Sequence, residues 1–269
     1  MLLQNARGSK SASGAAQATG GETGRTWRRH DRIRSTETPT EGDRVTGDSK
    51  PSLVLDHLRR ALPAPVTPPR RVRLTEVGDI RRTPGGRPMP FEAVTEFGVH
   101  EVGFSWRARF PIAPLLTMRV HDGYSDGTGW MRGTIVGVPF MRRGGPQIAV
   151  AGAIRYLAEL PWAPHAMLAN PHLDWRQTAP RTVEVATNVD GVQVAVDFEF
   201  DARGDIVSAS SAARPRDGDV PRPWGGRFGE YVVMGGVRIP GSGEVSWDLP
   251  DGRFTYWRAR VTSLETIDP

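Results

Sequence analysis

The sequence lacks cysteine altogether, and its only two lysines, Lys10 and Lys50, lie within the first 50 of its 269 residues. The absence of cysteine excludes disulfides, thiolate metal ligands, iron–sulfur ligation and cysteine nucleophiles. Beyond residue 50 there is no lysine amine for a Schiff base or for a phosphate-binding loop. Acid–base, hydration or isomerisation chemistry is therefore the easiest enzymatic chemistry for the rest of the chain.

Long apolar runs are missing as well. No run approaches the ~18–20 consecutive apolar residues that a helix needs to cross a bilayer. The first ten residues, MLLQNARGSK, lack the apolar stretch that a secretion signal requires. We therefore expect a protein that has no membrane span and resides in the cytoplasm.

Aromatic residues and charge are distributed unevenly. All four tyrosines, all nine phenylalanines and seven of the eight tryptophans lie beyond residue 90. Residues 1–73 carry a net charge of +7 (14 basic minus 7 acidic), and residues 74–269 carry −2 (21 minus 23). This distribution predicts a disordered basic tail over residues 1–50, a short helix and Pro-rich linker over 51–70, and a single α+β domain over 71–269. Trp27 is the only Phe, Tyr or Trp of the tail, so aromatic residues do not alternate with the basic ones along it, and we do not expect nucleic acid as a partner.

Apolar periodicity predicts two helices. Leucines at three- and four-residue spacing indicate a helix over residues 52–62, which Pro63 ends. A second, amphipathic helix is predicted over residues 146–162, with Pro146 in its first turn.

Strands are predicted where β-branched and aromatic residues lie between Gly or Pro turns. They are expected over residues 89–99, 102–110, 115–124, 129–140, 192–200, 206–211, 228–234, 237–247 and 253–263, with turns at Asp122-Gly123 and Asp126-Gly127. In the last strand both faces carry apolar residues, so the sheet must be covered twice or must curl. The expected fold class is therefore α+β: a curved, largely antiparallel, half-barrel-like sheet of ~9–10 strands with a central helix covering one side.

The densest group of chemically capable side chains lies at the end of the second helix. Arg155 and Glu159 are four residues apart and can pair along one helix face. Glu159, His165, Asp122 and Tyr156 are the candidate acid–base residues, and Arg155 is the candidate anchor for an anion. The alternative is an exposed ion pair within the helix that takes no part in chemistry.

Aromatic side chains are the candidates for contact with a ligand. Large rings can line a cavity and stack on a planar molecule. Together with Arg155, the candidate ligand-binding residues are Trp106, Tyr124, Trp130, Trp162, Trp175, Tyr231 and Trp247. The alternative is that most of these tryptophans pack an ordinary core.

No motif points to a metal or a cofactor. His165, His172 and Asp174 lack the spacing of a helical zinc site. Asp122 and Asp126 lack the regular series of a calcium loop, and hairpin turns explain them as well. Neither a G-x-S-x-G elbow nor a dinucleotide-binding G-x-G-x-x-G occurs in the right context. We expect no metal site and no cofactor.

The segment RYLAELPWAPHAML, residues 155–168, resembles the signature R-Y-L-A-E-x-x-W-x-P-x-A-L-L of a bacterial family of unknown function. Further matches extend the resemblance over residues 75–265. His165 and Met167 stand where the family usually has Thr and Leu. The strand and helix order of the family is similar to that of lipoprotein carriers, in which a curved antiparallel sheet wraps helices and holds an acyl chain. The resemblance implies such a fold by analogy and does not fix a function.

Two functions follow as hypotheses. The first is binding of an apolar or aromatic, lipid-like small molecule in a hydrophobic cavity between the curved sheet and the second helix. The second is a cytoplasmic, cofactor-independent enzyme that uses the acid–base residues around the same cavity. In both cases the expected partner is a small molecule.

Overall fold

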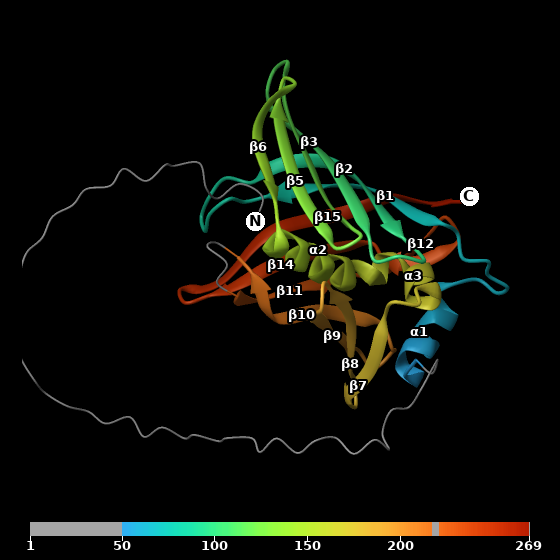
Figure 1. Ribbon diagram of the computed structural model, residues 1–269. Helices are drawn as coiled ribbons and strands as arrows, with labels where there is room; N and C mark the ends of the chain where they lie inside the picture. Colours follow the sequence, from blue (N-terminus) through green and yellow to red (C-terminus); the bar gives the residue numbers. More distant parts are fainter. Residues whose placement is uncertain (1–49, 217–220, 269) are drawn as a thin grey trace, which may run out of the picture. The chain divides into compact units, whose positions relative to one another are not determined.

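The computed structural model describes residues 50–216 and 221–268, and its elements carry the labels of Figure 1. The disordered tail predicted over residues 1–50 lies outside the described residues except for Lys50. The helices are α1 (Ser52–Ala61), α2 (Pro146–Glu159) and α3 (Pro164–Ala169), with a 3-10 turn over Leu160–Trp162 before α3. Both predicted helices are thus present, and the second ends in this turn.

Fifteen strands occur in the described part of the chain. Those that precede α2 are β1 (Arg71–Ile80), β2 (Met89–Gly98), β3 (Phe104–Ala113), β4 (Leu116–Ser125), β5 (Thr128–Ile135) and β6 (Val138–Gly144). Those that follow α3 are β7 (Asp174–Ala179), β8 (Thr182–Val189), β9 (Val192–Phe200), β10 (Ile206–Pro215), β11 (Pro221–Phe228), β12 (Tyr231–Met234), β13 (Val237–Pro240), β14 (Ser242–Leu249) and β15 (Gly252–Ile267).

Thirteen of these strands form one antiparallel sheet, in the order β6-β5-β4-β3-β2-β1-β15-β14-β11-β10-β9-β8-β7, and β12 pairs with β13 in a separate hairpin. The long strand β15 joins the two halves, since it pairs with β1 on one side and with β14 on the other. The sheet is curved but not closed, because β6 and β7 remain its two edges among the described strands. The predicted fold class is confirmed.

The central helix α2 lies between the two halves of the curved sheet (Figure 1). It contacts β4 and β5 on one side and β8, β9 and β10 on the other. Small residues allow this close packing: a side chain at Gly129 of β5 would overlap the backbone at Ile148, and one at Gly152 would meet Tyr124. Because Ala149, Gly152 and Ala153 are all buried, α2 is a core helix with little exposed surface.

The helix α1 packs onto the folded part of the chain. Val54 and Leu58 belong to the same buried core as the sheet residues Phe198 and Phe200. His57 is also fully buried and meets the ring edges of Phe200 and Tyr231. Residues 52–61 therefore contribute to the core as well as leading into the Pro-rich segment.

Several details of the predicted strands are wrong. Residues 129–140 form two strands instead of one, because Val136 and Gly137 adopt positive φ angles of 50° and 81° and reverse the chain. The turn expected at Asp122-Gly123 does not exist, since both residues pair with β5 inside β4. Residues 237–247 also fall into two strands, β13 and β14, and β7, β8 and all but the last residue of β11 were not predicted. The total of fifteen exceeds the expected ~9–10.

Candidate functional site

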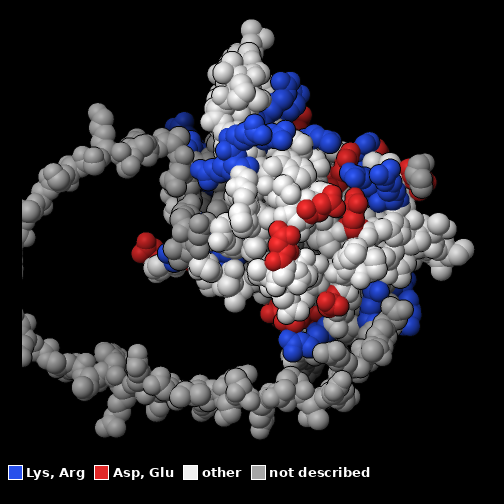
Figure 2. Space-filling view, in the orientation of Figure 1, with Lys and Arg blue, Asp and Glu red and all other residues white. Residues whose placement is uncertain are grey.

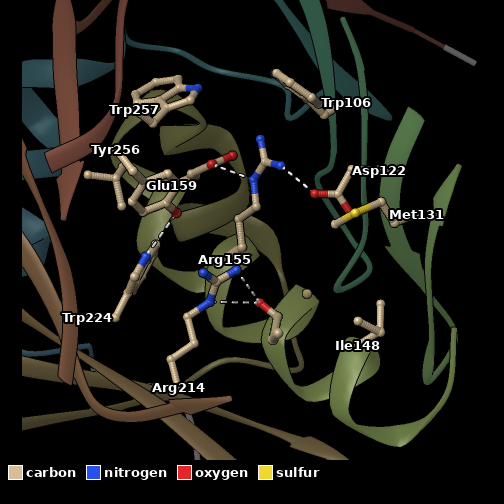
Figure 3. A pocket seen from close by; sticks show the side chains of 13 residues that line it. Trp106, Asp122, Met131, Ile148, Arg155, Glu159, Arg214, Trp224, Tyr256 and Trp257 are labelled. Carbon is tan, nitrogen blue, oxygen red and sulfur yellow. Dashed lines mark hydrogen bonds and ion pairs between the residues drawn. The ribbon is translucent and has the colours of Figure 1, made fainter. Parts of the chain in front are cut away.

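The candidate site is a pocket between α2 and the curved sheet (Figure 3). One stripe of α2 forms its floor through Ile148, Ala151, Gly152, Arg155 and Glu159, which recur at three- and four-residue spacing. The sheet supplies the remaining lining residues Trp106, Asp122, Met131, Arg214, Trp224, Val245, Tyr256 and Trp257. The pocket thus brings both halves of the sheet to one face of the helix.

A buried ion-pair cluster lies at one side of this pocket. The Nε of Arg155 donates to Glu159 at 2.7 Å, and its Nη1 donates to Asp122 at 2.8 Å (Figure 3). The guanidinium carbon also lies 4.7 Å from the ring centre of Phe104 and 5.3 Å from that of Trp106. The ion pair is therefore not the exposed one that the alternative interpretation assumed: Arg155 and Glu159 face the pocket.

The protonation of this cluster is shifted by its burial. Burial raises the pKa of Glu159, although the neighbouring Arg155 partly opposes the shift. Burial alone lowers the pKa of Arg155, but the carboxylates of Glu159 and Asp122 outweigh it and leave the pKa raised. Arg155 therefore stays cationic, while Glu159 accepts a proton more readily than an exposed glutamate.

A further carboxyl group lies behind Trp106. Glu76 of β1 is almost fully buried and accepts hydrogen bonds from the indole N–H of Trp106 at 2.6 Å and from the hydroxyl of Thr95 at 3.4 Å. Burial, reinforced by the negative charge of Glu159, raises the pKa of Glu76 to about 7. Glu76 does not line the pocket itself, but its charge acts on the residues that do.

A second arginine enters the pocket from the other half of the sheet. Arg214 of β10 donates to the carbonyl oxygen of Ala151 through Nε at 3.3 Å and Nη2 at 3.1 Å (Figure 3). Its guanidinium carbon lies 4.3 Å from the ring centre of Trp224. Its buried Nη1 has no acceptor of good geometry among the described residues. Burial lowers the pKa of Arg214, and the nearby Tyr256 hydroxyl opposes this shift.

The pocket is small and partly polar. Its volume is about 50 Å³, whereas pockets for drug-sized molecules measure roughly 300–1,000 Å³. Four charged side chains line it: Asp122, Arg155, Glu159 and Arg214. In this state of the protein the pocket can hold water or a small polar group, and it is less hydrophobic than the cavity expected from the sequence.

Four of the predicted site residues meet at this pocket, namely Glu159, Asp122, Arg155 and Trp106. The other eight lie elsewhere. Tyr156 donates to the carbonyl of Gly98 and accepts from the side chain of Asn170, inside the core. His165 is buried in α3, and its Nδ1 has no hydrogen-bond partner among the described residues. Neither side chain lines the pocket.

The remaining aromatic candidates are packing residues or lie at other surfaces. Trp162 donates to the carbonyl of Pro240 at 2.9 Å and packs against Phe228. Two of the others pack against glycines: Trp130 against Gly123 and Tyr124 against Gly152. Three have ring contacts with a neighbouring side chain: Trp175 with Phe198, Tyr231 with His57, and Trp247 with Tyr256. None of these side chains lines the pocket. Trp162 and Trp247 are buried in the core, as the packing alternative for the tryptophans described.

Sequence reasoning did not select Tyr256 and Trp257 as site residues, and a β-bulge explains why. Val245 pairs with Trp257 and Ser246 pairs with Thr255, so Tyr256 is an extra residue in β15. The bulge breaks the alternation of the strand and allows two successive residues to line the same pocket. No periodicity marks Arg214 either, because it lies beside irregular pairing between β10 and β11.

Within the described residues, no group of three or more His, Asp or Glu side chains is arranged to hold a metal ion. No helix in the same residues is long and apolar enough to span a membrane.

Fold and site together define an α+β protein with a charged, tryptophan-walled pocket between a central helix and a curved sheet. The chain belongs to a family of unknown function, DUF6544, whose family model matches residues 46–259. The match begins before α1, earlier than the start of the resemblance noted from the sequence. The particular signature motif quoted for that family stays a prediction. No curated protein matches the sequence at a significant level.

Solved structures with a similar arrangement exist. A LolA superfamily protein from Nitrosomonas europaea superimposes with a TM-score of 0.43 and 8% identity, covering 83% of this chain and 96% of that one. A domain named as an outer membrane lipoprotein-sorting protein, from Vibrio parahaemolyticus, gives 0.39 and 7%, covering 80% and 91%. A beta-barrel-like protein of the family DUF1849 from Brucella abortus gives 0.29 and 10%, covering 76% and 100%.

Proposed function

We propose that the protein binds a small amphiphilic molecule, lipid-like or aromatic, between α2 and the curved sheet. The observation that carries the proposal is the composition of the pocket, where Trp106, Trp224 and Trp257 stand beside a cluster of charges. Aromatic rings offer an apolar surface, and a few placed polar groups fix the orientation of a ligand. An amphiphilic molecule satisfies both parts of this lining.

Arg214 is the group that we assign to the polar end of the ligand. Arg155 already donates to two carboxylates, whereas the buried Nη1 of Arg214 has no acceptor of good geometry among the described residues. A buried donor without an acceptor costs free energy that a ligand oxygen would recover. A carboxylate or phosphate would also gain from the positive charge of the guanidinium.

The apolar part of such a ligand requires the pocket to enlarge. About 50 Å³ corresponds to the space of one or two water molecules, at roughly 30 Å³ each. Met131 lines the pocket and has a flexible side chain that can adopt other rotamers. We place the enlargement at Met131, between α2 and β5.

Native mass spectrometry of the full chain tests the proposal, together with tryptophan fluorescence during titration with a long-chain fatty acid. We expect a bound mass that is lost on denaturation, or saturable quenching by the fatty acid. Arg214→Gln should weaken binding at least about tenfold, since a charge-assisted hydrogen bond contributes roughly 1.5–3 kcal/mol. Arg227→Gln, on the exposed surface of β11, is the matched control. The absence of both a bound mass and any quenching would rule the proposal out.

A second candidate function is acid–base catalysis, and one observation favours it. Glu159 faces the pocket, and burial raises its pKa toward the range where a carboxyl group can donate and accept protons. In this hypothesis Glu159 is the acid or base, and Arg155, which also bonds Asp122, holds it in place. Tyr156 and His165 take no direct part. Glu159→Gln should abolish turnover of any metabolite that the protein converts while leaving its binding intact. Unchanged turnover would contradict the assignment.

A further inference from the structure

The hairpins β3–β4 and β5–β6 extend beyond the core (Figure 1). Several apolar side chains at their ends are exposed. Phe110 and Met118 form the last opposed pair of β3 and β4 in which both residues are buried. Around and beyond this pair the chain exposes a set of apolar residues that we call the hairpin tips: Ile112, Leu115, Val136, Val138 and Phe140. Leu115 is fully exposed, and Val136 and Val138 are exposed by 63% and 68%.

The two tips form one surface. Met118 of β4 pairs with Ile135 of β5, and the N–H of Val136 donates to the carbonyl of Thr117. The turn of the second hairpin therefore lies beside the end of the first. Scattered exposed apolar residues are common in proteins, but several adjacent ones on a projection mark an interaction surface.

The backbone at these turns is unfavourable for the residues that occupy it. Leu115 has φ of 63° and Val136 has φ of 50°, in the left-handed region. Glycine or asparagine adopts this region at lower cost, and a β-branched residue such as valine is rare there. Leu115 and Val136 thus combine a strained backbone conformation with an exposed apolar side chain. Contact with another molecular surface would explain both features.

The charge next to the tips is of one sign. Residues 107–121 and 130–143 contain six arginines, at positions 107, 109, 119, 132, 142 and 143, and no aspartate or glutamate. Figure 2 shows the uncharged projection with basic residues gathered beneath it. Only two of the six arginines face acidic groups of the neighbouring strand β2 among the ion pairs of the described residues: Arg107 faces Glu96 at 3.7 Å, and Arg109 faces Glu92 at 4.0 Å.

We propose that the hairpin tips insert into the interface of a membrane leaflet that contains anionic lipids. The apolar side chains would enter the boundary between head groups and acyl chains, and Arg119, Arg132 and Arg142 would meet the lipid phosphates. Charge favours this occupant over a second copy of the chain, because two copies joined at their tips would bring their arginines together. The inference does not depend on the pocket or on its ligand.

Flotation of the full chain with vesicles tests the inference. Vesicles of phosphatidylcholine mixed with phosphatidylglycerol should carry the protein, and vesicles of phosphatidylcholine alone should carry much less. The variant Leu115→Asn with Val136→Asn should bind at least about tenfold more weakly, since two aliphatic side chains are lost. Asparagine tolerates the left-handed conformation, so this variant should fold at least as well as the natural chain.

Charge variants measure the electrostatic contribution to the binding of vesicles. Arg119→Gln with Arg142→Gln should weaken binding to the mixed vesicles by about fivefold for each arginine. Matched controls are Val192→Asn with Val233→Asn, which are 54% and 69% exposed on other hairpins, and Arg181→Gln with Arg203→Gln. Both controls should bind like the natural chain.

Three results would overturn the inference. The natural chain could fail to float with the mixed vesicles. The tip variant could float as well as the natural chain, which would assign the binding to other basic residues of the chain. The natural chain could also be a dimer in sedimentation that the tip variant makes monomeric, which would identify the tips as a contact between copies.

Discussion

The indole N–H of Trp106 donates to the carboxyl group of Glu76 across 2.6 Å, with both side chains buried in the sheet. Trp106 also faces the pocket, so this hydrogen bond connects a pocket wall to a titrating group behind it. Burial raises the pKa of Glu76 from 4.5 to about 7. The carboxyl group is therefore partly protonated near neutral pH, and the stability of the fold depends on that proton.

The first prediction concerns this dependence. A carboxyl group whose pKa is raised on folding stabilises the protein fully below its unfolded pKa, and the contribution is lost as the pH rises through the folded pKa. Between pH 4.5 and about 7 the loss amounts to about 3 kcal/mol, at 1.36 kcal/mol per pKa unit. Glu76→Gln should remove this pH-dependent loss, so that the variant becomes more stable relative to the natural chain as the pH rises. Urea denaturation of both proteins at several pH values measures the difference.

Glu92→Gln is the control for Glu76→Gln. Glu92 is exposed on the neighbouring strand β2, so its replacement should change the free energy of unfolding by much less than the replacement of the buried Glu76. A constant difference between Glu76→Gln and the natural chain at every pH would show that Glu76 does not titrate in this window.

The second prediction concerns the centre of the ion-pair cluster. Arg155→Met leaves Glu159 and Asp122, whose side chains are only 14% exposed, without their cation; since breaking a fully buried pair costs about 3–5 kcal/mol, we expect a loss up to that size. Removing Arg155 also removes a group that lowers the pKa of Glu159. The loss of stability should therefore be smaller at low pH, where Glu159 is protonated, and larger at high pH. Thermal denaturation across pH detects both effects.

Two comparisons make this prediction specific. Adding Glu159→Gln to Arg155→Met should restore part of the stability at high pH, because one uncompensated charge is gone. Arg59→Met breaks an exposed ion pair with Asp56 on α1, which is worth about 1 kcal/mol or less. Equal losses for Arg155→Met and Arg59→Met would mean that the cluster is not buried in solution.

The sequence predicted the architecture well because the architecture depends on local patterns. The helix over 146–162 was recognised from apolar spacing, and the structure places α2 at Pro146–Glu159. The curved sheet was inferred from the two apolar faces of the last strand, which is β15. Both inferences use properties of single segments, which one sequence contains.

The pocket was predicted only in part because it depends on contacts between distant segments. Arg155 and Glu159 are neighbours on one helix, so their pairing could be anticipated, and Asp122 was among the candidate acid–base residues. Arg214 reaches the same pocket from β10, and only the folded sheet brings it to Ala151. Tyr256 reaches it through a bulge that no periodicity shows. Register and bulges belong to strand pairs, so a single strand does not reveal them.

The third prediction concerns acid conditions and a different group. Burial lowers the pKa of His57 from 6.5 to about 4. A histidine whose pKa is lowered on folding costs stability as the pH falls, because only the unfolded chain takes up the proton. Between pH 6.5 and about 4 the cost reaches about 3 kcal/mol. His57→Gln should lose less stability than the natural chain across this window.

The charged groups around His57 make this assignment testable. The Nδ1 of His57 lies 3.3 Å from the carbonyl oxygen of Gly204 and is a candidate donor to it, while Arg60 and Arg238 oppose protonation of the ring. Asp205 pairs with Arg238, and this lowers its pKa, so it stays ionised over most of the window. His57 and Glu76 change the free energy of unfolding with opposite sign over overlapping pH ranges. Their effects therefore offset each other in the natural chain and are distinguished only in the single variants. A His57→Gln profile parallel to that of the natural chain would contradict the prediction.

The last prediction concerns the contact that sets the position of α2. A Cβ at Gly129 of β5 would come within 2.5–2.6 Å of backbone atoms of Ile148 and Ala149, at the start of the helix. Backbone cannot move aside as a side chain can, so Gly129→Ala should destabilise the fold by about 1–3 kcal/mol. Gly144 of β6 pairs opposite Trp130, and a Cβ there would meet only one atom, at 3.4 Å, so Gly144→Ala is the matched control. Ile148 also lines the pocket, so Gly129→Ala should weaken fatty-acid quenching of tryptophan fluorescence while Gly144→Ala leaves it unchanged. If both variants were equally stable and quenched alike, β5 would not hold the helix in place, and the pocket would owe its shape to the other half of the sheet.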